Sequence, residues 1–123
     1  MAEDAKTLID RAVRAFLDEV PALKPLTLVV GIDLHGRGDT QQFRLQMPEV
    51  EVTKDIGADA RIRVEMRREF FNAMVEHGAR IPDWREAFIH GQAKATGVEQ
   101  YMRLIINVVE RQEERNRTRK ARH

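Results

Sequence analysis

The spacing of hydrophobic residues changes twice along this chain, and the change limits the folds open to it. Residues 8–20 repeat apolar side chains every third or fourth position, which predicts an amphipathic helix that Pro21 and Pro25 end. Apolar and polar residues then alternate, which predicts antiparallel strands near 27–35, 43–47, 50–52 and 60–66. Such a sheet is apolar on one face, so it needs helices to cover that face. The pattern therefore predicts an α+β fold.

Helical spacing returns after residue 66 and is interrupted by glycines. A helix starting near Glu69 closes at Gly78, and a short helix at 82–89 closes at Gly91. Residues 92–96 alternate small and polar side chains between two glycines, which favours a fifth strand. Thr96-Gly97-Val98-Glu99 fits a capping box, so the last helix is expected to begin near Gly97. The predicted order is helix, four strands, two helices, strand, helix.

Length and composition exclude several classes of protein. The 123 residues suit one domain, predicted over 1–110, with a basic helix end or tail at 111–123. The 21 basic residues nearly balance 20 acidic ones, which argues against a nucleic-acid partner. Without cysteine or serine, the chain has no thiolate metal site, no disulfide and no serine nucleophile. No apolar run is long enough to span a bilayer, and the first four residues lack the features of a signal peptide, so the expected location is cytoplasmic.

Polar motifs offer little catalytic chemistry. Asp33 and His35 share one strand face and are the best acid/base candidates, although a solvent-facing polar pair explains them much better. The four histidines lack metal-ligand spacing, so neither a metal nor a cofactor is expected. The Gly36–Thr40 segment is interpreted as a glycine-rich hairpin turn, because a strand rather than a helix follows it. An enzyme is thus the least favoured function.

The apolar helix faces are the most informative feature. Large side chains such as Phe70, Met74 and Phe88 are predicted to cover a strand whose inward groups are only Ala93 and Ala95. Ordinary core packing explains most of these residues. A strand with methyl-sized groups under large, soft side chains also indicates a void that an apolar ligand could fill.

Residues 59–109 resemble the sterol carrier protein type 2 domain family. The similarity lies in the alternating strand at 60–66, the Glu69-Phe70-Phe71 helix start, the short helix ending in 86–91, and the strand between Gly91 and Gly97. The resemblance implies a five-stranded, largely antiparallel (mixed) sheet covered on one face by helices. It also implies an apolar tunnel between sheet and helices for fatty-acyl chains, acyl-CoA or sterols, and no catalytic residues. Here Arg67 stands where the family often has a helix cap, and the peroxisomal ending is absent.

The sequence therefore predicts a non-catalytic carrier of a lipid-like molecule, with the final helix as its lid. The large apolar residues and the two alanines are the predicted pocket: Phe70, Phe71, Met74, Trp84, Phe88, Ala93, Ala95, Tyr101, Met102 and Ile105. The basic residues of the tail are predicted to contact an anionic membrane transiently: Arg115, Arg117, Arg119, Lys120 and Arg122. The alternative is an interaction or homodimerisation module that uses the apolar helix face.

Overall fold

A computed structural model describes residues 4–121, with side chains described through residue 119. The order of helices and strands is the predicted one, with a short 3-10 helix, η1, added after the first helix. The elements are α1 (Ala5–Glu19), η1 (Pro21–Leu23), β1 (Leu28–His35), β2 (Thr40–Met47), β3 (Glu51–Lys54), β4 (Ile62–Arg67), α2 (Arg68–Glu76), α3 (Ile81–Ile89), β5 (Ala93–Gly97) and α4 (Glu99–Ala121). None of the helices described here is long and apolar enough to cross a membrane.

The five strands form one mixed sheet in the order β3-β2-β1-β4-β5. All neighbouring strands are antiparallel except β1 and β4, which run parallel. The expectation that the first four strands are all antiparallel is therefore wrong for this pair, and the mixed sheet implied by the resemblance is confirmed. After β3, the chain crosses from one edge of the sheet to the far side of β1. A connection of this kind can return the chain in the parallel direction, which a tight hairpin cannot.

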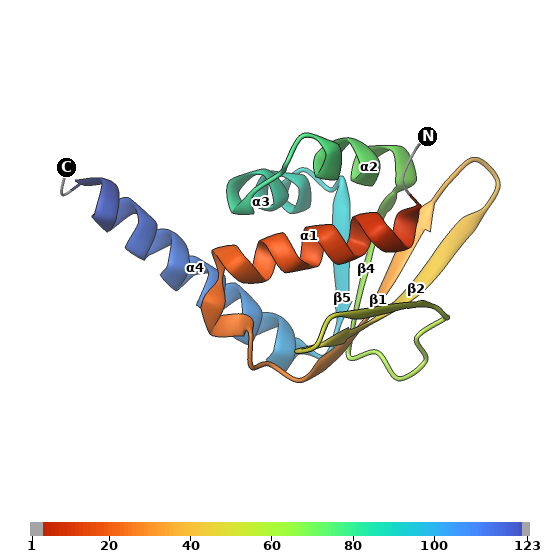
Figure 1. Cartoon of the computed structure of the whole chain (residues 1–123), viewed down its shortest axis with the longest axis horizontal. Coiled ribbons are helices and arrows are strands. Elements are labelled where there is room, and N and C mark those ends of the chain that lie inside the picture. The colour runs from red at the N-terminus through yellow and green to blue at the C-terminus, as the bar shows by residue number, and fades with distance from the viewer. Residues whose placement is uncertain (1–3, 122–123) are drawn as a thin grey trace.

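Helices α1, α2 and α3 lie over one face of the sheet (Figure 1), as the alternation of apolar residues predicts. Leu8, Ile9 and Leu17 of α1 are buried in the core with Leu34 and Phe43 of the central strands. Four large side chains are almost completely inaccessible to solvent: Phe43, Ile9, Leu34 and Val20. None of these comes from β4, β5 or a later helix, so the tightest packing lies under α1.

The opposite face of the sheet carries a network of polar side chains. Asp33 is only 7% exposed, and its carboxylate accepts hydrogen bonds from Arg63 at 2.7 Å and from Gln42 at 3.4 Å. His35 instead contacts Thr40 at 2.9 Å and Glu65 at 3.2 Å through its two ring nitrogens. Asp33 and His35 thus have separate partners on this face.

Two glycines mark the transition from β5 into α4 and from α3 into β5. Gly97 has a φ of 141°, and a Cβ there would lie 2.3 Å from the carbonyl oxygen of Arg61. Gly91 also has a positive φ, 76°, but a Cβ there would meet nothing within 4 Å. The backbone at Gly97 therefore approaches β4 more closely than any side chain allows.

The helix starts differ in part from the sequence prediction. Thr96 belongs to β5 and pairs with Arg63, so it cannot cap the helix, and the predicted capping box at 96–99 is wrong. Pairing with β4 continues through Gly97, so α4 begins only at Glu99. Helix α2 has no side-chain cap at Arg67, as predicted.

Candidate functional site

Several apolar side chains on the β4–β5 side of the molecule are only half-buried, although they lie beside fully buried ones such as Ile62, Met66 and Ala93. Most of the predicted pocket residues are half-buried: Phe70, Met74, Trp84, Ala95, Tyr101, Met102 and Ile105. All of these except Ala95 pack against the core. Val64, the strand partner of Ala95, is half-buried as well. We refer to these eight residues as the half-buried cluster. Its members come from β4, β5, α2, α3 and α4.

Three other predicted pocket residues lie at the two extremes of burial. Phe71 is 4% exposed and contacts Trp84, with ring centroids 6.3 Å apart and planes tilted by 38°. Ala93 is 1% exposed, which places it inside the packed core. Phe88 is 41% exposed and lies at the surface of α3. Phe71 and Ala93 thus belong to the buried core rather than to the half-buried cluster.

Helix α4 lies shallowly on the rest of the molecule. Tyr101, Met102, Ile105, Val108 and Val109 face the body, yet none of them is fully buried. Its tie to α3 is an ion pair between Arg85 and Glu113, and the Glu113 side chain is only 12% exposed. A helix held by a polar clamp and a half-buried apolar face can separate from the body more easily than one buried in the core.

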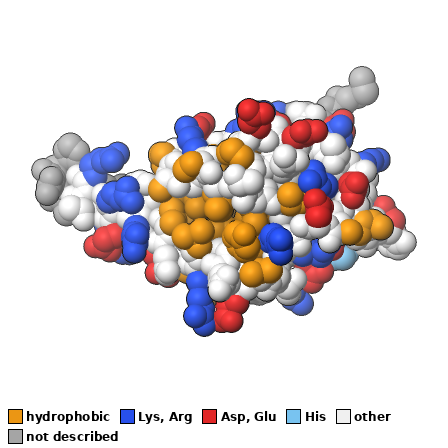
Figure 2. All heavy atoms as spheres, turned by 90° about the horizontal axis from the view of Figure 1, so that it is seen from below, with side chains coloured by type: hydrophobic (Ala, Val, Ile, Leu, Met, Phe, Trp, Pro, Cys, Tyr) orange, Lys and Arg blue, Asp and Glu red, His pale blue; other side chains and the backbone are white. Residues whose placement is uncertain are grey.

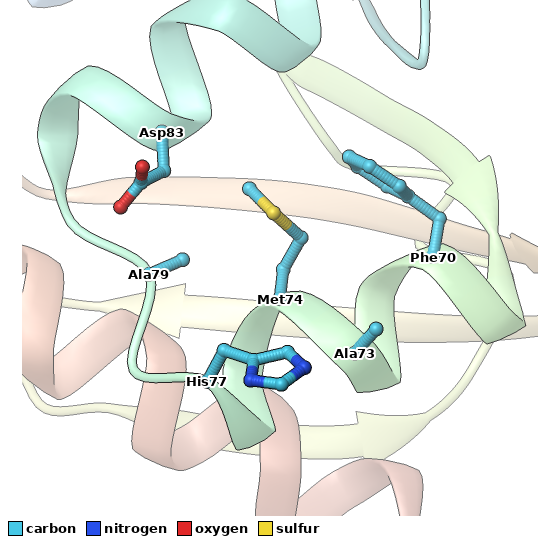
Figure 3. A pocket seen from close by; sticks show the side chains of 6 residues that line it. All are labelled: Phe70, Ala73, Met74, His77, Ala79 and Asp83. Carbon is cyan, nitrogen blue, oxygen red and sulfur yellow. The ribbon is translucent and has the colours of Figure 1, made fainter.

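A cleft of about 280 Å³ opens between α2 and α3 (Figure 3). Phe70 and Met74 of the half-buried cluster extend into it from α2, and Asp83 of α3 lies opposite. Ala73, His77 and Ala79 complete its lining. The sequence analysis predicted two of the six lining residues; the other four are small or polar, and only the 77–80 turn between the helices brings them to this place.

The rim of this cleft carries two titratable side chains. The Asp83 carboxylate already accepts a hydrogen bond from the backbone N–H of Arg80 at 2.8 Å, which fixes the start of α3. His77 is exposed at the end of α2. The cleft therefore combines an apolar floor with a polar rim, an arrangement that suits an amphipathic molecule.

A second cleft, of about 350 Å³, lies between α1 and the α2–α3 pair. Its floor is made of small residues and Trp84, and its rim includes the ion pair between Arg80 and Glu19. Ala79 lines both clefts. Neither cleft is lined by Ala93, Ala95 or a residue of α4. A tunnel between the sheet and the helices therefore stays a prediction.

The predicted membrane-contact residues lie on or beyond the second half of α4. Arg115 and Arg119 are exposed, whereas Arg117 is paired with Glu114 on the preceding turn. The side chain of Lys120 and all of Arg122 lie outside the described residues. In the described part of the chain, no group of three or more histidine or carboxylate side chains is placed to hold a metal ion.

The structure thus combines an α+β sheet, helices on one face of that sheet, and a set of incompletely buried apolar side chains. By sequence, no protein-family model and no curated protein matches the chain. Its structure, however, matches several solved proteins. The palmitated form of SCP2L2 from Aedes aegypti superposes with a TM-score of 0.59 at 15% identity, covering 87% of this chain and 95% of that one.

Two further comparisons agree on the fold. The apo form of sterol carrier protein 2 from Yarrowia lipolytica gives a TM-score of 0.51 at 18% identity, over 80% of this chain and 92% of that one. A sec-alkyl sulfatase gives 0.54 at 15% identity, and the match covers 87% of this chain but only 16% of the sulfatase. The chain has the sterol carrier protein 2 fold. The same fold also occurs as a small part of an enzyme.

Proposed function

We propose that this chain is a non-catalytic carrier that binds a lipid-like molecule through the half-buried cluster. The observation that carries the proposal is the uneven burial of the apolar face. The four most deeply buried large side chains lie in or next to α1 and the central strands. The eight residues of the half-buried cluster remain partly accessible to solvent, as do Ala12, Val13 and Phe16 of α1. A protein gains stability by burying such groups, so a site that leaves eight of them half-buried suits a ligand that completes the burial.

The ligand class follows from the chemistry of the site. The cluster offers aromatic rings, a thioether and aliphatic groups, and its polar neighbours lie at the rim of the α2–α3 cleft. Fatty-acyl, acyl-CoA and sterol-like molecules share an apolar body with a polar end. Each buried methylene contributes roughly 0.8 kcal/mol, so a chain of a dozen carbons is enough for useful affinity. The proposed mechanism is partition under α4, which acts as the lid.

The absence of catalysis is part of the proposal. Asp33 and His35, the best acid/base candidates in the sequence, are engaged separately on the polar face of the sheet, away from the half-buried cluster. A carrier needs no group that reacts with its cargo. A cytoplasmic location stays a prediction from the sequence.

The proposal is tested by measuring ligand binding to a matched pair of variants. Ile105 faces the cluster and is half-buried, whereas its neighbour Ile106 is 52% exposed on the other side of α4. Ile105→Gln is expected to weaken the binding of a fluorescent fatty acid by about tenfold, because it places a polar group against the ligand. Ile106→Gln is expected to leave the affinity unchanged. Melting temperatures of both variants show whether either is misfolded.

Native mass spectrometry of the freshly purified wild-type chain provides an independent measurement, with co-purified lipid as the expected result. A wild-type chain that binds neither fluorescent fatty acids nor sterols, and carries no lipid after purification, contradicts the carrier function.

A second candidate function is a protein-interaction or homodimerisation module. It is favoured by four large apolar side chains that are exposed on α3 and α4: Phe88, Ile89, Leu104 and Ile106. Under this alternative, sedimentation velocity would show a concentration-dependent dimer, and Ile106→Gln would dissociate it. A monomer at all concentrations that binds fatty acid supports the carrier instead.

A further inference from the structure

One side of α4 carries a row of exposed residues that the carrier function does not use. Leu104, Arg111, Arg115 and Arg119 are separated by 7, 4 and 4 positions. With about 3.6 residues per turn, these intervals return to nearly the same side of a helix. All four side chains are exposed. We call this row the α4 stripe.

Within the part of the chain that the structure describes, the arginines of the α4 stripe are without partners. Among the described residues, no ion pair or hydrogen bond engages the side chains of Arg111, Arg115 or Arg119. The other arginines of the helix differ in this respect: Arg103 is bound to Glu99 at 2.5 Å, and Arg117 is paired with Glu114. Glu99 and Glu114 of α4 thus pair with arginines outside the stripe. Three adjacent uncompensated cations are available to an anionic partner.

The position of the stripe favours a broad surface over a small ligand. The second half of α4 extends past α1 and α3 and projects from the body (Figure 1), so a flat surface can approach it. Nearer the body, Leu104 is 44% exposed. Figure 2 shows an apolar patch on this side of the molecule, over the first half of α4 and the segment that follows α1. Apolar groups next to a row of cations match the boundary between headgroups and acyl chains in an anionic bilayer.

We propose that the α4 stripe docks the protein on an anionic lipid surface, with the three arginines on the headgroups and Leu104 inserted between them. The proposal deepens the carrier function, on which it rests, because it places the lid helix against the membrane where a lipid would enter or leave. It changes the sequence prediction for the tail in two ways. Arg111 is added to the residues that contact the membrane, and Arg117 is removed from them.

The test is co-sedimentation of the full chain with phosphatidylcholine vesicles, with and without phosphatidylglycerol, at low and near-physiological ionic strength. The wild-type chain is expected to bind only the anionic vesicles, more weakly at higher salt. Each basic side chain near an anionic surface contributes about fivefold to the affinity, so replacing all three stripe arginines with glutamine should weaken binding by about 100-fold. A matched control replaces three other exposed, unpartnered arginines with glutamine: Arg37, Arg61 and Arg67. The control has the same net charge and should bind nearly as well as wild type.

A second pair of variants tests the apolar contact. Leu104→Gln should weaken vesicle binding several-fold, whereas Ile56→Gln, at a still more exposed apolar residue on the β3–β4 loop, should not. Equal loss in the stripe variant and its arginine control would show a general charge effect and overturn the proposal. Equal binding of wild type and Leu104→Gln to polyglutamate, without binding to vesicles, would assign the stripe to an acidic protein instead.

Ligand binding without vesicles separates this proposal from the carrier function. The stripe variant should bind a fluorescent fatty acid in solution as tightly as wild type, because the half-buried cluster is unchanged. If wild type binds anionic vesicles but no fatty acid, the carrier function fails and the docking surface stands. If it binds fatty acid but not the vesicles, only the docking proposal fails.

Discussion

Two alanines of β5 provide a sharp test of whether space exists beside the sheet. Ala93 and Ala95 face the same side of the strand, two positions apart, but Ala93 is 1% exposed and Ala95 is half-buried. Ala93 lies beside the buried Met66, so a leucine there must displace neighbouring atoms. Overpacking of this kind costs about 1–3 kcal/mol. For a chain of this length, that lowers the melting temperature by about 4–12 °C.

Ala95→Leu is expected to behave differently. Its larger side chain enters the half-buried cluster beside Val64, where it replaces solvent or ligand rather than protein atoms. Its melting temperature should stay close to that of wild type, and it should weaken long-chain fatty acids more than short ones, because it shortens the space available to the chain.

Differential scanning calorimetry and fatty-acid titration with two chain lengths measure both effects. Equal destabilisation by the two variants, with affinities independent of chain length, would refute the existence of a ligand space above β5.

Three further predictions concern the scaffold. Gly97→Ala should prevent folding or lower the melting temperature severely, since its Cβ would lie 2.3 Å from the backbone oxygen of Arg61, the residue before β4. Gly91→Ala should cost only about 1 kcal/mol of backbone strain, and thermal unfolding measures both effects. Asp33→Ala should destabilise the fold by about 1–3 kcal/mol in urea titrations, because it leaves the partly buried Arg63 without its carboxylate partner. A change within about 0.5 kcal/mol, as ordinary surface substitutions give, would contradict a stabilising role for this ion pair. Arg44 lowers the pKa of Asp59 through a side-chain hydrogen bond. The Asp59 carboxylate therefore stabilises the fold above its unfolded pKa near 3.8, and this stabilisation is lost as the pH falls through the lower folded pKa. Asp59→Asn should remove this part of the acid sensitivity, which melting curves at several pH values measure.

The sequence by itself determined the order of the elements and most of their boundaries. The alternation in β1, β2 and β4 and the helical spacing in α1 and α2 reflect which face each element buries, and that choice is local. Glycines at 78, 91 and 97 mark the ends of elements because their positive φ values are a property of single residues. The polar face of the sheet could also be foreseen, since Asp33, Arg63 and Glu65 occupy the outward positions of their strands.

The tertiary structure alone decided what these elements form together. The parallel pairing of β1 and β4 depends on where the chain crosses the sheet, which no local pattern records. The residues around Thr96 match a helix-capping sequence, but in the structure Thr96 pairs with Arg63 of β4 and belongs to β5. The difference in burial between Ala93 and Ala95 depends on how closely α3 and α4 approach the same strand. Burial is a property of packing between distant segments, so the half-buried cluster and the partnerless arginines of the α4 stripe became visible only in three dimensions.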